Sequence, residues 1–287
     1  MRLNHNMLSL SAFNTYKKSL ASNSSALERI STGLKINSAK DNPNKIAQSE
    51  QMRIQIKCLE TANRNVQDTY SMVQTAEGAM QEASNMINRM RELAVSAADG
   101  SKSEGDIEAI QKELDELKAG LNDLANNTEF NGIKLLGNKD VSSNKYPVHI
   151  STVVGAQVGE NINVPQYNIT TTVLKDSKGN TIEDIDLSTP EKANAALKTF
   201  DEVIGTVGSI RSKYGSLIAR FESTSENLEA NIYISESAES SIRDADIAVE
   251  MMEIARTNIL SQSSIGLIAQ TNEMPQDCLR ILQNVRR

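Results

Sequence analysis

The sequence predicts a mainly α-helical protein: an elongated coiled-coil helical bundle formed by both termini, with a small β-rich insert in the middle. Long stretches near both ends repeat apolar residues every seven positions. Aromatic residues make up only 3% of the 287 residues and tryptophan is absent, whereas a thick globular core normally uses more large rings. The alternation typical of strands is confined to a central segment.

The first long heptad stretch begins at Leu59 and continues to Ala97. Its seam consists of two sets of residues at period seven, three positions apart, and every member is apolar except Thr69. The six uninterrupted heptads exceed the length of about 8–20 residues that is usual for globular helices. The first set is Leu59, Val66, Val73, Met80, Ile87 and Ala94.

A second stretch with the same period lies downstream, in residues 193–228. Two seams of similar length can bury each other, which predicts a helix bundle. The alternative, that both stretches are ordinary core helices of a compact domain, stays open at this point. The downstream seam is Ala193, Phe200, Val207, Tyr214, Phe221 and Leu228.

In chain order, the first predicted element is an amphipathic helix over residues 3–34. Its apolar residues include Leu3, Leu10, Phe13, Leu20 and Leu27. A break follows, after which Asn42 can cap the long helix and Pro43 can occupy its first position, where a missing N–H costs nothing. Ser103 and Asp106 resemble a capping box that starts a third helix, expected to end near Asn126.

The pattern changes after the Asn131-Gly132 pair. Val148–Ser151 and Asn161–Val164 alternate between apolar and polar residues, and Ile169–Leu174 is rich in β-branched residues. We therefore predict a few short strands in the insert.

Thr189 and Pro190 then restart a helix that we expect to continue to about Ser235. The last predicted element is an amphipathic helix that Pro275 should interrupt or kink. Its apolar residues include Ile247, Met251, Ile254, Ile265 and Ile268.

Composition limits the classes of partner. A formal charge of −7 argues against nucleic acid, because phosphate binding needs a basic surface. No apolar run is long enough for a membrane span, and residues 1–7 lack the features of a signal peptide, so composition alone indicates a cytoplasmic protein. Two cysteines do not make a disulfide framework, and we expect Cys58 and Cys278 to be small buried hydrophobic residues.

Catalytic chemistry is not indicated. The two histidines, His5 and His149, lie far apart in different predicted elements, so neither a histidine-based metal site nor a catalytic triad is expected. The sequence contains no phosphate-binding loop or dinucleotide fingerprint. We therefore predict no cofactor, no metal and no enzymatic activity.

Several strings, in matching order, closely resemble bacterial flagellin. Toward the N-terminus they are STGLKINSAKD at 31–41, RNVQD at 64–68, VQTAEGAM at 73–80 and MRELAV at 90–95. Toward the C-terminus they include IRDADIA at 242–248 and AQTN at 269–272. The resemblance covers about residues 1–135 and 190–284.

The resemblance implies a structural subunit that polymerises into the flagellar filament for motility. It assigns 1–40 and 237–287 to an inner tube around the export channel, 41–134 and 188–236 to a helical outer tube, and 135–187 to a solvent-facing insert. The apolar residues of the two terminal helices would then be polymer contacts. They are predicted to pack against each other within one subunit and against neighbouring subunits.

The resemblance also replaces the cytoplasmic prediction, because flagellins leave the cell through the flagellar export apparatus without a cleaved signal. It implies an extracellular location and several partners: other subunits, an export chaperone at the C-terminal helix, and the filament cap and hook-filament junction proteins. Recognition by a host Toll-like receptor would involve Arg89, Leu93 and Glu113.

One departure from the family pattern keeps an alternative open. Residues 41–48 read DNPNKIAQ where flagellins usually have an acidic residue followed by alanine and glycine. An Asp-x-Pro at this place resembles the related hook-filament junction protein. A non-flagellar coiled-coil adaptor that binds partner helices is a further alternative, and it would stay a discrete oligomer at any concentration.

Overall fold

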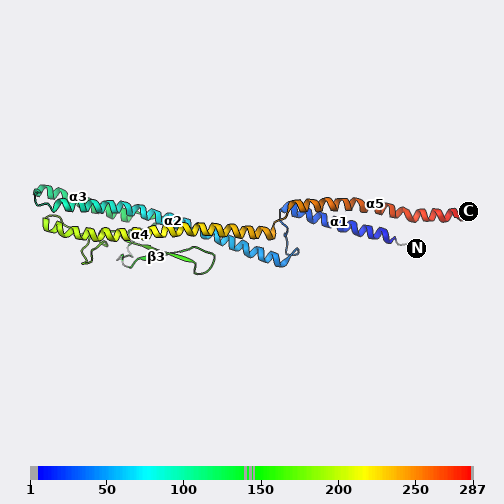
Figure 1. Cartoon of the computed structure of the whole chain (residues 1–287), viewed down its shortest axis with the longest axis horizontal. Helices are drawn as coiled ribbons and strands as arrows, with labels where there is room; N and C mark the ends of the chain where they lie inside the picture. Colours follow the sequence, from blue (N-terminus) through cyan, green and yellow to red (C-terminus); the bar gives the residue numbers. More distant parts are fainter. Residues whose placement is uncertain (1–5, 139–140, 142–143, 145, 286–287) are drawn as a thin grey trace. The chain divides into compact units, whose positions relative to one another are not determined.

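The computed structural model describes residues 6–138, 141, 144 and 146–285 (Figure 1). The chain divides into two compact units. The middle unit is Lys57–Ile232, and the terminal unit combines Met1–Ile56 with Tyr233–Arg287. Two long helices, α2 (Pro43–Ala97) and α4 (Pro190–Arg243), contribute residues to both units.

In the middle unit, α2 and α4 run antiparallel, and α3 (Glu104–Asn127) returns along α2. Ion pairs join α2 to α4 at two places: Arg91 to Asp201 at 2.7 Å and Glu77 to Arg211 at 2.8 Å. Solvent-exposed ion pairs of this kind contribute little to stability, because water and salt screen them. The packing of apolar side chains therefore dominates the stability of this unit.

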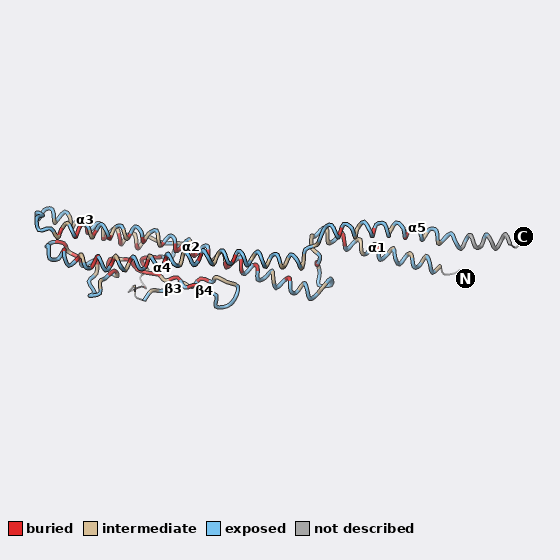
Figure 2. The backbone as a smooth tube through the Cα atoms, in the orientation of Figure 1, coloured by how far each residue is buried: buried red, intermediate tan, exposed pale blue. Residues whose placement is uncertain are grey.

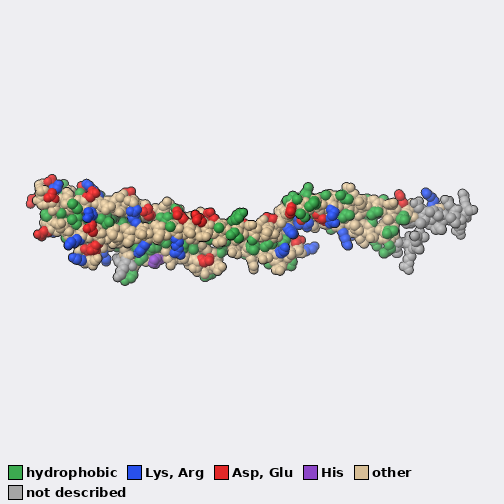
Figure 3. Space-filling view, in the orientation of Figure 1, with side chains coloured by type: hydrophobic (Ala, Val, Ile, Leu, Met, Phe, Trp, Pro, Cys, Tyr) green, Lys and Arg blue, Asp and Glu red, His purple; other side chains and the backbone are tan. Residues whose placement is uncertain are grey.

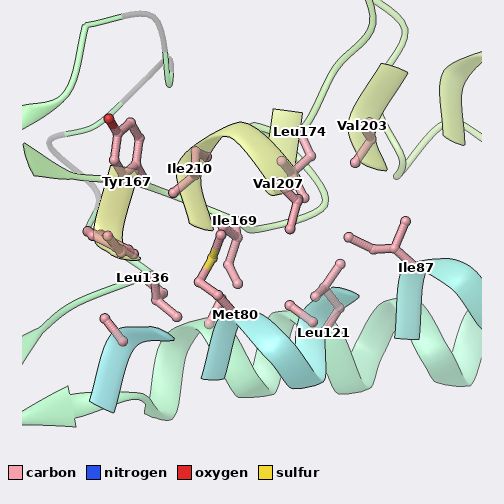
Figure 4. Close-up of a cluster of buried hydrophobic side chains, with 14 of the residues drawn as sticks. Met80, Ile87, Leu121, Leu136, Tyr167, Ile169, Leu174, Val203, Val207 and Ile210 are labelled. Carbon is pink, nitrogen blue, oxygen red and sulfur yellow. The ribbon is translucent and has the colours of Figure 1, made fainter. Parts of the chain in front are cut away.

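The core of the middle unit follows the two predicted seams (Figure 2). Every residue of both sets in α2 is buried, and so are the six residues spaced by seven in α4. The one polar member, Thr69, shares a 3.1 Å hydrogen bond with Thr152, which satisfies its hydroxyl. Figure 4 shows side chains from the helices meeting Ile169 and Leu174 of the insert in this core.

The helix starts agree with the capping signals in the sequence. The side chain of Asn42 accepts a hydrogen bond from the backbone N–H of Lys45 at 3.1 Å, and α2 begins at Pro43. Ser103 and Asp106 form both bonds of a capping box at α3. Thr189 accepts a bond from the N–H of Lys192, and Pro190 is the first residue of α4. These predictions are confirmed.

In the part of the chain that the structure describes, four short strands form two antiparallel hairpins. β1 (Glu129–Phe130) and β2 (Ile133–Lys134) are joined by Asn131 and Gly132, both at positive φ, as a tight hairpin turn requires. β3 (Val148–Val153) pairs with β4 (Asn161–Gln166), with Val148 opposite Gln166. The apolar residues Ile162 and Val164 of β4 are buried in the core, which fixes this hairpin to the helices.

The predicted strand at Ile169–Leu174 is wrong. The Asn168 side chain accepts bonds from the N–H and hydroxyl of Thr170, and the Thr170 carbonyl accepts from the N–H of Leu174. These local bonds make a turn instead of a ladder. The apolar residues of the segment are nevertheless buried, because the turn presents Ile169 and Leu174 to the helical core.

Two long helices also differ from the prediction, one at its end and one in its interior. α4 continues to Arg243, beyond the predicted end at Ser235, and Glu239 in the added turns accepts a hydrogen bond from Ser49 of α2 at 3.0 Å. The serines Ser240 and Ser241 are satisfied locally, by bonds to Asp244 at 2.6 Å and to the carbonyl of Ala238 at 2.8 Å. α5 (Ile247–Val285) remains helical through Pro275, so the predicted interruption does not occur.

The prediction that Cys58 is buried is also wrong, because its thiol is exposed. Cys58 directly precedes the seam residue Leu59, and one residue of an α-helix turns the side chain by about 100°, away from the buried face. The side chain of Cys278 lies outside the part that the structure describes.

Two glycines of the middle unit should respond to alanine in opposite directions. A Cβ at Gly137 would lie 2.6 Å from the carbonyl oxygen of Ala125, so alanine should lower the free energy of unfolding by about 1–3 kcal/mol. A Cβ at Gly205, in the exposed face of α4, meets nothing within 4 Å. Alanine there should raise the free energy by about 0.5–1 kcal/mol.

Urea unfolding of the full chain, followed by circular dichroism, would measure both effects. Equal responses of the two variants would contradict the close packing of Gly137 on α3.

Candidate interaction surface

The terminal unit is built on an antiparallel pair of helices, α1 (Met7–Thr32) and α5 (Figure 1). Asn6 caps α1 through its side-chain oxygen, and its Nδ2 donates to the carbonyl of Thr271 at 2.7 Å. Further along the pair, Asn23 Nδ2 donates to Thr257 Oγ1 at 2.9 Å. These bonds between distant parts of the sequence align the two helices along their length.

The face on which α1 and α5 meet is lined with small and polar side chains. Only two α1 residues are fully buried, Ser19 and Ala26. Glu250, Thr257 and Ser264 are the buried residues among the described side chains of α5. We call these five residues the α1–α5 seam. Small side chains let the two helices approach closely but bury little apolar surface, so the pair gains little hydrophobic stabilisation from its own contact.

The large apolar side chains of these helices lie outside the seam. Of the 24 large hydrophobic residues that are exposed in the described part of the chain, six belong to α1 and nine to α5. Hydrophobic residues are visible along this pair in Figure 3. A concentration of this kind marks an interaction surface. The residues are Met7, Leu8, Leu10, Phe13, Leu20, Leu27, Ile247, Val249, Met251, Met252, Ile259, Leu260, Ile265, Leu267 and Met274.

In α1 the exposed stripe adjoins the seam. Leu20 directly follows Ser19, and Leu27 directly follows Ala26, so both lie at one edge of the face that contacts α5. Leu20 is 54% exposed and Leu27 is 52% exposed. A partner that covers this edge would extend the α1–α5 contact sideways.

In α5 the exposed apolar residues surround most of the helix. Ile265 directly follows the seam residue Ser264, and Leu260 lies at the other edge of the seam. Met252 and Ile259 are two residues past seam positions and therefore lie on the opposite face. A helix with apolar residues on several faces is stabilised when these faces are covered, and α1 covers one of them.

The structure does not bring the predicted apolar stripes together within one chain. Leu10, Phe13, Leu20 and Leu27 of α1 are exposed, as are Ile247, Met251 and Ile265 of α5, whereas Ile254 and Ile268 are half-buried. Leu3 lies outside the described residues. The seam itself escaped the sequence reasoning because four of its five members are polar and the fifth, Ala26, is small. The sequence feature that could have identified the seam is its heptad spacing: Ser19 lies seven residues before Ala26, and Thr257 lies seven residues before Ser264.

A charged pair closes one end of the α1–α5 contact. Arg29 donates from Nε to one carboxylate oxygen of Glu250 at 2.8 Å and from Nη2 to the other at 2.7 Å. The hydrogen bonds that Arg29 donates to Glu250 raise the pKa of Arg29 above its usual value. Bidentate geometry of this kind is stronger and more directional than a single hydrogen bond.

The segments that follow α1 and precede α5 are joined by a short antiparallel bridge. The N–H of Lys35 donates to the carbonyl of Arg243 at 2.6 Å, and the N–H of Ala245 donates to the carbonyl of Gly33 at 2.9 Å. Gly33 ends α1 at φ 72°, a conformation that favours glycine. The Arg243 guanidinium bonds Glu50 at 2.9 Å and lowers the pKa of that carboxyl.

Two of the three residues predicted to contact a receptor lie together on the surface of the middle unit. Arg89 donates to Glu113 at 2.8 Å and to Glu92 at 3.1 Å, and these bonds raise its pKa. Leu93 is 5% exposed and packs in the helical core. Its side chain is therefore unavailable to a partner of the folded unit.

Among the described residues, no three histidine, cysteine, aspartate or glutamate side chains are grouped so as to hold a metal ion. None of the helices in the same residues has the length and apolar character needed to cross a membrane.

Comparison with known proteins gives the family. Residues 3–140 match the model of the bacterial flagellin N-terminal helical region, and residues 197–282 match that of the C-terminal helical region. The chain is 36% identical to a flagellin of Bacillus subtilis over 306 residues, covering 99% of this chain and all of that protein. It is 34% identical to the flagellar filament 33 kDa core protein of Treponema phagedenis, over 99% of this chain and all of that protein.

Among solved structures, a putative flagellar hook-associated protein from Vibrio parahaemolyticus aligns with a TM-score of 0.60, covering 71% of this chain and all of that chain. At 14% identity this likeness shows a shared fold alone. The full-length relatives are flagellins and filament core proteins, and they favour neither the junction protein nor the adaptor. This chain belongs to the bacterial flagellin family and is a structural subunit of the flagellar filament.

Proposed function

We propose that the subunit polymerises through α1 and α5, whose exposed apolar residues bury against the terminal units of neighbouring copies. The observation that carries this proposal is the inverted arrangement of the helix pair: small and polar residues face inward while 15 large apolar residues face outward. A free chain would expose this surface to water. In a polymer, each terminal unit is surrounded by those of other copies, so this apolar surface is removed from water.

The energies favour assembly. Complete burial of a large apolar side chain contributes about 1.5–3 kcal/mol. Several such residues per copy, each already about half exposed, would together exceed the cost of holding subunits in a fixed orientation. We expect the pair to be poorly ordered in the free subunit, because its own seam provides little apolar burial, and to fold as it joins the polymer.

The five segments then take distinct places in the filament. Residues 1–40 and 237–287 form the inner tube, 41–134 and 188–236 form the helical outer tube, and 135–187 faces solvent. This arrangement follows the resemblance to flagellins, and the concentration of exposed apolar residues in the first and last segments supports it. In this proposal the subunit is purely structural and catalyses no reaction.

Export and partner binding follow from the same surface. The chain leaves the cell through the flagellar export apparatus without a cleaved signal peptide and reaches the extracellular filament. An amphipathic helix that binds in a groove is a common recognition mode, and α5, with Leu260, Leu267 and Met274 exposed, suits an export chaperone. The filament cap and the hook-filament junction proteins meet the ends of the polymer.

A polar partner contact is proposed on the middle unit. Arg89 and Glu113 are about half exposed and form one charged cluster across α2 and α3. This surface suits either a neighbouring subunit or a host Toll-like receptor, with Leu93 serving as support beneath it.

Deletion of residues 1–34 tests the polymerisation proposal. The truncated chain should form no filaments when mixed with seeds, while the helical circular dichroism of the middle unit persists. The matched control is the full chain with Lys18→Gln and Glu28→Gln, two exposed positions of α1, which should polymerise normally. Filaments of the truncated chain would refute the proposal.

A further inference from the structure

The α1–α5 seam does not specify by itself how the two helices are aligned. Ser19 and Ala26 are similar in size and lie one heptad apart, and the same is true of Thr257 and Ser264. A shift of one heptad would exchange these small side chains for one another. Because the five buried positions carry no large apolar side chain, packing at these positions does not select one register, and polar contacts can do so.

The charged pair at the end of the seam makes that selection possible. Glu250 keeps only 12% of its side-chain surface exposed, and both of its oxygens accept bonds from the Arg29 fork. Arg29 itself is 28% exposed. A buried carboxylate is costly unless it is paired, so a register that separates the two residues is disfavoured.

Other polar bonds agree with the same register. Ser22 donates to Glu253 at 3.0 Å, and Asn23 donates to Thr257 at 2.9 Å. Both couple α1 to α5 within two turns of the charged pair. A single hydrogen bond constrains the alignment less than the bidentate pair, whose two bonds fit one geometry.

We propose that Arg29 and Glu250 act as positioning residues that set the register of α1 on α5 in the assembled subunit. This inference rests on the proposed function, because the pair is expected to be ordered in the filament. A slip of one heptad along α1 places Ser22 opposite Glu250 and leaves the carboxylate without its cation. It also moves the Leu20 and Leu27 stripe by about 10 Å relative to the apolar residues of α5.

The consequence is a division of roles within the terminal unit. The exposed apolar residues supply the affinity between copies, and the charged pair determines which combined surface the two helices present. Polar groups at buried positions are best attested in this register-setting role.

Disulfide trapping in filaments tests the inference. In a chain carrying Cys58→Ser and Cys278→Ser, one pair of cysteines, Asn23→Cys with Thr257→Cys, reports the observed register. A second pair, Tyr16→Cys with Thr257→Cys, reports a slip of one heptad. With Arg29 and Glu250 intact, the first pair should cross-link about tenfold or more in excess of the second.

Neutralising both charges with Arg29→Gln and Glu250→Gln should reduce that ratio to about threefold or less, because the slipped register then leaves no carboxylate unpaired. Exchange of the charges, Arg29→Glu with Glu250→Arg, should restore a ratio near the original. As a matched control, Arg256→Gln removes an ion pair within α5, between Arg256 and Glu253, and should leave the ratio unchanged.

An unchanged ratio in the neutral variant would overturn the inference. If the neutral variant forms no filaments, the charge exchange decides: filaments with the native cross-link support the inference, and failure to polymerise overturns it. Failure of the parent chain with intact charges to grow on seeds would instead refute polymerisation itself.

Discussion

Replacement of Leu20 and Leu27 by asparagine is expected to abolish filament growth on seeds without changing the thermal unfolding of the middle unit. Both side chains are about half exposed at the edge of the α1–α5 seam. If each substitution removes about 1.5 kcal/mol of the free energy that burial of the leucine contributes to the polymer, the critical concentration should rise by about 100-fold. Sedimentation of the polymer at increasing subunit concentration measures this directly.

The control for this prediction is Leu20→Met with Leu27→Met, which keeps the apolar surface and should shift the critical concentration only slightly. Equal critical concentrations for the asparagine variant and the original chain would show that this stripe is not a contact between copies. A simultaneous loss of middle-unit stability would show that the change acts on folding.

The largest effect on stability is expected from Phe200→Ala. Phe200 is fully buried in the α4 seam, where it joins the helical core of the middle unit. Loss of the ring leaves a cavity that the surrounding helices fill only partly, which should lower the free energy of unfolding by about 3–5 kcal/mol. Thermal unfolding followed by circular dichroism should show a midpoint lower by about 10 °C.

Lys198→Ala provides the comparison, since Lys198 is exposed two residues earlier on the same helix and should change the free energy by about 0.5 kcal/mol or less. A Phe200→Ala chain that unfolds at the original temperature would mean that the α4 seam does not hold the middle unit together.

The helical core could be predicted from the sequence because its signal is long and redundant. Residues from Leu59 to Ala97 repeat one pattern over six heptads, so a single polar member such as Thr69 does not obscure it. The starts of the helices were equally predictable, because a cap such as Ser103 with Asp106 acts within one turn and does not depend on the rest of the fold.

The insert was less predictable because its segments are short and tertiary contacts decide their shape. Ile169–Leu174 has the composition of a strand, yet Asn168 bonds Thr170 locally and the segment turns. Ile169 and Leu174 are buried in the helical core, but a segment of this length does not distinguish a strand from a turn packed on helices.

The sequence predicted that the two terminal helices pack against each other, but the residues that line their contact escaped prediction for a different reason. Sequence reasoning identifies buried faces by apolar residues, and here the apolar residues belong to the exposed face while Ser19 and Thr257 are buried. A helix whose partners are other copies of the chain carries its strongest pattern on the intermolecular side. The inward face of such a helix has to be found from small residues at heptad spacing.

Seeded polymerisation tests whether this chain builds a filament from its own terminal helices. Purified protein is dissociated by heat, cooled, mixed with short seeds and imaged by negative-stain electron microscopy. Long, uniform filaments are expected from the full chain. Monomers or small discrete oligomers that persist in the presence of seeds would contradict it.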